Sequence, residues 1–185
     1  MIKLLSCVKK TIWTSIYTLP ASTTSAHCCK TWATWRGLPY YERALAIREK
    51  ALGPDHPDTA TSLNNLGRLL QDMGDLAGAR PYYERALAIR EKALGPDHPD
   101  TATSLNNLGY LLQAMGDLAG ARPYYERALA IREKALGPDH PDTATSLNNL
   151  GGLLRAMGDL AGARPYYERA LAIREKALGP DHPDT

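Results

Sequence analysis

Residues 58–99, DTATSLNNLGRLLQDMGDLAGARPYYERALAIREKALGPDHP, decide the fold, because nearly the same stretch returns as residues 100–141 and again as residues 142–183. Near-identity at a fixed period of 42 residues is the signature of a stacked array, in which each unit packs mainly on its neighbours. Ala, Leu, Arg and Glu are abundant and Phe is absent, which favours helices. The sequence therefore predicts an all-α repeat fold.

The first predicted helix of the second unit (helix A) spans residues 100–115. It follows the loop 95–99, GPDHP, in which glycine suits the backbone after a helix end and proline cannot continue a helix. Asp100 is the expected N-cap. Gly109 costs about 1 kcal/mol relative to alanine inside a helix, so its return in every unit predicts that a neighbouring helix passes closely there. The apolar face of helix A comprises Leu105, Leu108, Leu111, Leu112 and Met115.

The second helix of the unit (helix B) is expected over residues 118–136, after a tight turn in which Asp117 is the N-cap. Pro123 lies several residues into this helix and predicts a kink or a loose first turn. Helix B carries two apolar stripes, so it needs partners on both sides, its own helix A and the next unit. One stripe comprises Ala121, Tyr125, Ala128 and Leu129, and the other comprises Tyr124, Ile131 and Ala135.

The order of small and apolar residues in each unit resembles the tetratricopeptide repeat (TPR) family. Its pattern W-x2-L-G-x2-Y, then A-x3-F-x2-A, is followed with Leu in place of both Trp and Tyr. The longer unit is similar to the 42-residue repeats of kinesin light chains and of many bacterial and fungal signalling proteins. The resemblance covers residue 39 to the C-terminus and implies a right-handed superhelical α-solenoid of antiparallel helix pairs. The matching residues are Leu63, Leu66, Gly67, Leu70, Ala79, Tyr83 and Ala86.

The repeats also set the expected organisation of the chain. Neither end of the array carries a polar cap, so we expect either a piece of a longer array or self-association through the uncapped ends. The predicted parts are a non-repeat leader at 1–38 with a short amphipathic helix at 2–17, an orphan helix B (39–52) and its loop at 39–57, three units at 58–99, 100–141 and 142–183, and the start of a truncated repeat at 184–185.

Three interpretations of the leader are open: a disordered segment unrelated to the repeats, a mitochondrial targeting peptide, or an out-of-frame translation of another repeat. The third is favoured for about residues 19–37. Met-Gly codons read one nucleotide late give tryptophan, as at Trp32, and Leu-Leu-Gln codons followed by Asp give Cys-Cys-Lys, as at residues 28–30. The sequence of the gene decides between these interpretations.

Composition argues against several classes of partner. The formal net charge is +2, but residues 1–38 hold five basic residues and no acidic one, so the repeat region is slightly acidic and lacks the footprint of a nucleic-acid-binding protein. No run approaches the roughly 18 apolar residues of a membrane span. Cys7, Cys28 and Cys29 all precede the repeats, without the spacing of zinc ligands. We therefore expect a cytoplasmic protein with no nucleic-acid or membrane partner.

Catalysis, cofactor and metal binding have little support. One loop histidine recurs per unit, and stacked units would hold these rings about 10 Å apart, too far to share an ion, so a role in loop packing or capping is expected. Charged runs such as Arg90-Glu91-Lys92 are interpreted as a solvated helix face. The family resemblance implies that the second tyrosine of each Tyr-Tyr pair lies in the core between the helices. We expect no enzyme activity and no cofactor. The histidines are His56, His98, His140 and His182.

The three units differ at only three positions, all on helix A. The family resemblance implies that helix A lines the concave surface and that these positions face it. Two interpretations are open: the changes tune a ligand groove, or they are neutral drift at exposed sites. The varied sets are Arg68/Tyr110/Gly152, Gln71/Gln113/Arg155 and Asp72/Ala114/Ala156.

A pair of asparagines recurs on the same helix. An amide offers both donors and an acceptor, so a ladder of amides can pair with the backbone of an extended peptide whatever its side chains. The first asparagine of each pair has an alternative role, a hydrogen bond within or between repeats. The predicted groove residues are Asn64, Asn65, Arg68, Gln71, Asp72, Asn106, Asn107, Tyr110, Gln113, Asn148, Asn149 and Arg155.

These features predict a protein-interaction scaffold that holds an extended peptide of a partner protein in its concave groove. Tyr110, Arg68 and Arg155 would set sequence preference, because a guanidinium can fork onto a carboxylate. The alternative is a fragment of a larger multidomain signalling protein, for example one with a nucleotide-binding switch domain, in which the repeats serve as a sensor or assembly surface.

Overall fold

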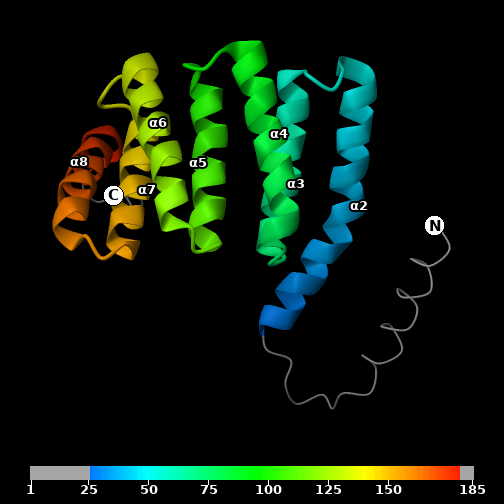
Figure 1. Cartoon of the computed structure of the whole chain (residues 1–185), viewed down its shortest axis with the longest axis horizontal. Helices are drawn as coiled ribbons and strands as arrows, with labels where there is room; N and C mark the ends of the chain where they lie inside the picture. Colours follow the sequence, from blue (N-terminus) through cyan, green and yellow to red (C-terminus); the bar gives the residue numbers. More distant parts are fainter. Residues whose placement is uncertain (1–25, 180–185) are drawn as a thin grey trace. The chain divides into compact units, whose positions relative to one another are not determined.

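A computed structural model describes the backbone of residues 26–179, which is helix and short connecting loops with no strand (Figure 1). The predicted all-α fold is confirmed. The chain divides into two units, residues 1–33 and 34–185, and the packing described below is that of the second. The predicted helix at 2–17 lies outside the described residues. The helices are α2 (Ala26–Leu52), α3 (Pro57–Asp72), α4 (Leu76–Leu94), α5 (Pro99–Ala114), α6 (Leu118–Leu136), α7 (Pro141–Ala156) and α8 (Leu160–Leu178).

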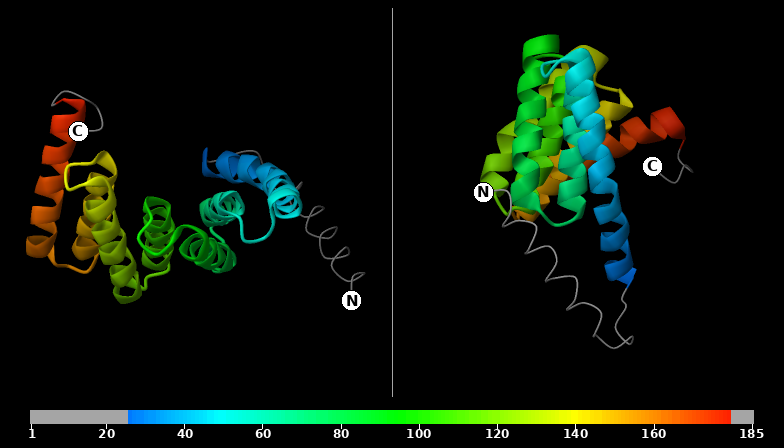
Figure 2. Two further views of the ribbon diagram at one scale, coloured as in Figure 1. Left: turned by 90° about the horizontal axis from the view of Figure 1, so that it is seen from above. Right: turned by 90° about the vertical axis from the view of Figure 1, so that its right-hand side faces the viewer.

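Helices A and B of the repeats form two layers. Each of α3 to α7 packs against the next helix in the chain, and α3 also contacts α5, as α5 contacts α7. The backbones of α4 and α6 make no such approach to each other in the described residues. Seen from above, α4 and α6 lie on one side of the row and α3, α5 and α7 on the other (Figure 2). Because the A helices lie closer together than the B helices, they form the inner layer of the solenoid.

A histidine, rather than the expected aspartate, caps helix A. His98 is the N-cap of α5, and its Nδ1 accepts a hydrogen bond from the backbone N–H of Asp100 at 3.1 Å. The prediction of Asp100 as N-cap is wrong because Pro99, whose ring presets a helical φ, already starts the helix one residue earlier. The carboxylate of Asp100 instead lies in the first turn, where the helix dipole favours it. The capping role expected for the loop histidines is confirmed at residues 56, 98 and 140, and His182 lies outside the described residues.

Helix B begins where the sequence indicates. Asp117 caps α6, and its side chain accepts a hydrogen bond from the N–H of Gly120 at 2.8 Å. The helix then runs unbroken through Pro123. The carbonyl of Ala119 loses its partner at that proline, but Ala119 is exposed, so water can replace the missing N–H.

The orphan helix is longer than predicted. We expected it to start at Pro39, where the repeat resumes, but α2 begins at Ala26 and passes through that proline. Leu45 is buried against α3 and α4, whereas Ile47, the equivalent of the buried Ile89, is 57% exposed. Self-association through such exposed apolar side chains stays a prediction.

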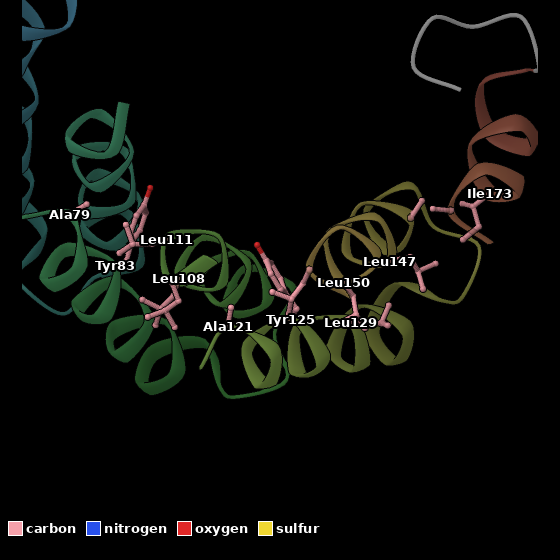
Figure 3. Close-up of a cluster of buried hydrophobic side chains, with 14 residues drawn as sticks. Ala79, Tyr83, Leu108, Leu111, Ala121, Tyr125, Leu129, Leu147, Leu150 and Ile173 are labelled. Carbon is pink, nitrogen blue, oxygen red and sulfur yellow. The ribbon is translucent and has the colours of Figure 1, made fainter. Parts of the chain in front are cut away.

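The core is continuous from one repeat to the next. One cluster of buried side chains takes members from α4, α5, α6, α7 and α8 (Figure 3). Tyr125 has its ring in this cluster and lies against Gly109, where an added Cβ would be 3.0 Å from Cε1 of the ring. The close approach predicted at this glycine is confirmed, and the approaching group is the tyrosine of the unit's own helix B.

A buried arginine joins each repeat to the next. Arg90 of α4 donates from Nη1 to the carbonyl of Asp100 at 2.8 Å and to Oγ of Ser104 at 3.0 Å, both on α5. Its Nη2 donates to Oγ1 of Thr61 on α3 at 3.3 Å. Oγ of Ser104 also accepts from Nδ2 of Asn64 at 3.2 Å. We call this set of bonds the inter-repeat joint.

The joint repeats one unit later around Arg132. Nη1 donates to the carbonyl of Asp142 and to Oγ of Ser146, and Asn106 donates to the same hydroxyl at 3.1 Å. Arg90 and Arg132 are each only 7% exposed, so the interpretation of Arg90 as part of a solvated face is wrong. Burial lowers the pKa of both guanidinium groups from the ordinary arginine value. An arginine is long enough to leave its own helix face and reach the two A helices beside it.

Exposed ion pairs join the B helices on their outer side. Arg127 on α6 pairs with Glu91 on α4 at 2.6 Å, and Lys134 pairs with Asp97 in the preceding loop. The hydrogen bond and charge of Lys134 lower the pKa of Asp97. Because these groups are well exposed, each pair adds little to stability.

The joint predicts unequal effects for two arginines of the same helix. Arg132→Ala leaves one buried and two part-buried acceptors without their charged donor, so the free energy of unfolding should fall by at least about 2 kcal/mol in urea denaturation. Arg127→Ala, which removes only an exposed pair, should cost less than about 1 kcal/mol. Equal losses for the two variants would contradict a special role of the joint.

The histidine cap predicts a second pair of variants. His98→Ala removes the acceptor for the N–H of Asp100 and should lower stability by about 1 kcal/mol, measured by urea denaturation. His98→Asn keeps a side-chain acceptor at the N-cap and should stay close to the parent protein. The capping assignment fails if alanine is tolerated as well as asparagine.

Candidate peptide-binding site

A pocket of about 290 Å³ lies between α5 and α7, on the inner layer. It lies between the second and third units, so the repeat stacking itself creates it. Tyr125 and Tyr167 reach it from the B helices, and Gly152 lies in its wall on α7. The pocket brings together five of the predicted groove residues, Tyr110, Gln113, Asn148, Asn149 and Arg155.

The two asparagines of each pair have different surroundings. Asn64 and Asn106 are 7% exposed and donate to the serines of the inter-repeat joint. The alternative that the sequence left open for the first asparagine, a hydrogen bond between repeats, is what the structure shows at these two positions. Asn148 is exposed and lines the pocket, because no helix follows α8 among the described residues.

The second asparagine of each pair, at residues 65, 107 and 149, is half-buried. None of these three amides has a hydrogen-bond partner among the residues that the structure describes. They return at the same position of α3, α5 and α7, one per inner helix. Each therefore keeps two donors and an acceptor available on the inner layer.

The glutamine position is coupled to a tyrosine. Oε1 of Gln71 accepts from the hydroxyl of Tyr83 at 3.1 Å, and Oε1 of Gln113 accepts from the hydroxyl of Tyr125 at 3.2 Å. Both glutamines are half-buried, so their carbonyls serve their own repeat. In the third unit the same position is Arg155, which cannot accept a hydrogen bond. The hydroxyl of Tyr167 consequently has no acceptor among the described residues.

The first unit carries the other varied charges. Arg68 and Asp72 are both exposed on α3. Burial, and after it the charge of Asp72, raise the pKa of Tyr83 to about 12, while Arg68 opposes the rise. Burial likewise raises the pKa of Tyr125. Both phenols are therefore neutral donors at physiological pH. Their oxygen atoms point away from the buried cluster, toward the same side (Figure 3).

Sequence reasoning missed the two tyrosines of the pocket. Tyr125 was assigned to the core, and its ring is there, but its edge also lines the pocket together with that of Tyr167. The available signal was the hydroxyl group: the family pattern has Phe at this position, and a phenol in a core needs a polar partner. Gly152 was recognised as varied but not as a pocket wall.

The pocket is lined by hydrogen-bonding groups and aromatic rings. Its polar groups are amides, phenols and one guanidinium. No group of three or more metal-ligating side chains occurs among the described residues. None of the described helices is both long and apolar enough to cross a membrane.

Comparison with solved structures gives kinesin light chain-like neighbours. BtubC (BKLC) from P. vanneervenii is 31% identical, with a TM-score of 0.71 over 83% of this chain and 61% of the other. This chain thus spans less than two thirds of that protein. Nearly identical TPR-like repeats of a Podosopora anserina protein assigned as a kinesin light chain are 28% identical, with a TM-score of 0.69 over 85% of this chain and 75% of the other. A search of curated proteins gave no match.

The family comparison agrees with the geometry. The model for the tetratricopeptide repeat matches residues 36–92, 64–134, 105–176 and 145–185, which together span the whole array. Repeats of this family generally mediate contacts between proteins and typically serve as scaffolds rather than catalysts. The stacked helix pairs, the shared sequence pattern and these matches lead to one conclusion: the chain belongs to the tetratricopeptide repeat family.

Proposed function

We propose that the array binds an extended peptide segment of a partner protein along its inner layer. The observation that carries the proposal is the row of asparagine amides at residues 65, 107 and 149, which are half-buried and have no partner among the described residues. Half-buried amides with unused donors and acceptors are suited to an extended backbone, which offers N–H and C=O groups at regular intervals. The repeat period fixes one such amide per unit.

Sequence preference would come from the varied positions. Near α3 the charges of Arg68 and Asp72 offset each other, whereas on α7 Arg155 has no acidic companion at the equivalent place, Ala156. The third unit is therefore the more favourable place for a carboxylate of the ligand, which a guanidinium can bind through two hydrogen bonds. The proposal thus gives the bound peptide a direction, with its acidic part at α7.

The geometry also sharpens the choice of residues to test. Asn64 and Asn106 hold the inter-repeat joint, so replacing them would disturb the scaffold itself. In the first two units, only the second asparagine of the pair can be removed without breaking a bond seen in the structure.

Replacing Asn107 and Asn149 together by alanine should weaken binding of ligand peptides about thirtyfold, since two net hydrogen bonds are lost at about 1 kcal/mol each. A peptide array followed by titration calorimetry measures the effect. Arg122→Ala, which breaks an exposed ion pair of α6 with Glu126, is the matched control and should leave binding unchanged. Undiminished binding by the asparagine variant, with its helix content intact, would count against the groove.

Arg155→Gln tests the preference for an acidic ligand. The variant copies Gln113 of the second unit, so the fold should be kept, and Tyr167 should gain the acceptor that Tyr125 has. Affinity for acidic peptides should fall about tenfold relative to neutral ones, as expected when a charged hydrogen bond is lost. Equal losses for both classes of peptide would mean that Arg155 does not select charge.

A further inference from the structure

The pocket between α5 and α7 exists at a position where the preceding junction holds a side chain. Gly152 is the equivalent of Tyr110. The other residues around the two positions correspond through the repeat, except that Arg155 replaces Gln113 and that Tyr110 and Ala114 of the preceding helix replace Arg68 and Asp72. At the junction of α3 and α5, a phenol therefore projects from the place that Gly152 leaves open. The chain itself thus carries a phenol at the equivalent place, and that phenol is 59% exposed.

Neither backbone strain nor crowding requires glycine at residue 152. Its φ is not positive, and a Cβ added there would meet only the hydroxyl of Tyr167, at an ordinary contact distance of 3.5 Å. The neighbouring Gly151 differs, because a Cβ there would lie 3.2 Å from the ring of Tyr167. Gly151 is needed for packing, while Gly152 leaves space that packing does not use.

The residues around Tyr110 indicate which groups a side chain beside Gly152 would meet. Besides burial, an electrostatic interaction with Tyr110 raises the pKa of Tyr83 and of Tyr125, which belong to the B helices on either side of it. At Gly152 the corresponding hydroxyls are those of Tyr125 and Tyr167, and the second has no acceptor in the described structure. Arg155 and Tyr110 add a guanidinium and a second ring, both of which favour a planar aromatic neighbour.

We propose that the pocket at Gly152 receives a tyrosine side chain of the bound peptide, which takes the place that Tyr110 occupies one repeat earlier. This inference rests on the proposed peptide groove and adds an anchor to it. The tyrosine ring would lie between Tyr110 and Tyr167, and its hydroxyl would accept from Tyr167. The amides of Asn107 and Asn149 would hold the backbone on either side.

The test uses the full chain labelled with nitrogen-15 and three probes, the acetylated and amidated peptides AAAYAAA, AAALAAA and AAAAAAA. The tyrosine peptide should shift the amide signals of Gly152 and Asn149 in a saturable way. It should bind about tenfold more tightly than the leucine peptide, as expected for an anchor that adds ring contacts and a hydrogen bond. The alanine peptide should leave Gly152 unshifted. Equal binding of tyrosine and leucine peptides would overturn the aromatic assignment.

Two variants exchange the residues found at the equivalent positions 110 and 152. Gly152→Tyr fills the pocket with the residue that the second unit carries there naturally, so the fold should be kept while the tyrosine peptide loses about tenfold in affinity. Tyr110→Gly should open an equivalent pocket between α3 and α5 and give new shifts on α5 when the tyrosine peptide is added. Retained affinity in Gly152→Tyr, or unchanged spectra in Tyr110→Gly, would contradict the proposal.

A random-sequence peptide pool separates this proposal from the groove itself. Binding of the pool that depends on Asn107 and Asn149, without any effect of the tyrosine peptide on Gly152, would overturn the pocket and keep the groove. Shifts at Gly152 without binding of the pool would overturn the groove and keep the pocket as an isolated site.

Discussion

The buried arginine of each joint is the contact on which the rest of the array depends. Arg132 reaches from helix B to its own helix A and to the helix A of the next unit, so one side chain fixes three helices. Apolar faces made of Ala and Leu could slide past each other by one turn at modest cost. A guanidinium that must meet a carbonyl and two hydroxyls allows one register only.

Some buried polar atoms of this joint lack hydrogen-bond partners, which limits how much the joint adds to stability. Nε of Arg132 and Oδ1 of Asn106 have no hydrogen-bond partner among the described residues, although both are buried. A buried guanidinium that has no carboxylate partner adds less stability than the number of its hydrogen bonds indicates. We infer that the joint contributes register more than strength, while the continuous apolar cluster supplies the strength. The same register places one free amide of each unit, such as Asn107, on the inner layer at a constant spacing.

Sequence reasoning reached the parts of the structure that local rules decide. The period gave the fold, the Gly-Asp turn gave the start of helix B at Asp117, and the glycine at 109 gave a close contact. It failed where two local rules compete or where a long side chain leaves its own face. His98 and Asp100 are both acceptable caps, and the proline between them decides in favour of the histidine. Arg90 lies in a charged run that is typical of a solvated face, and only the neighbouring helices reveal that it is buried.

The sequence indicates which helices carry the candidate site, but not which of its residues join the repeats and which have no partner in the described structure. The family resemblance implied that helix A forms the inner layer, and comparing the units found the varied positions on that helix. The two asparagines of a pair have the same chemistry, however, and only the serine of the next repeat distinguishes Asn106 from Asn107. The varied positions then act together. In the third unit, glycine at 152 removes a ring and arginine at 155 removes an acceptor, and both changes meet at Tyr167. Because every joint residue is identical between the units, the differences between their junctions must come from these few positions, and they alter one pocket in both its space and its polarity.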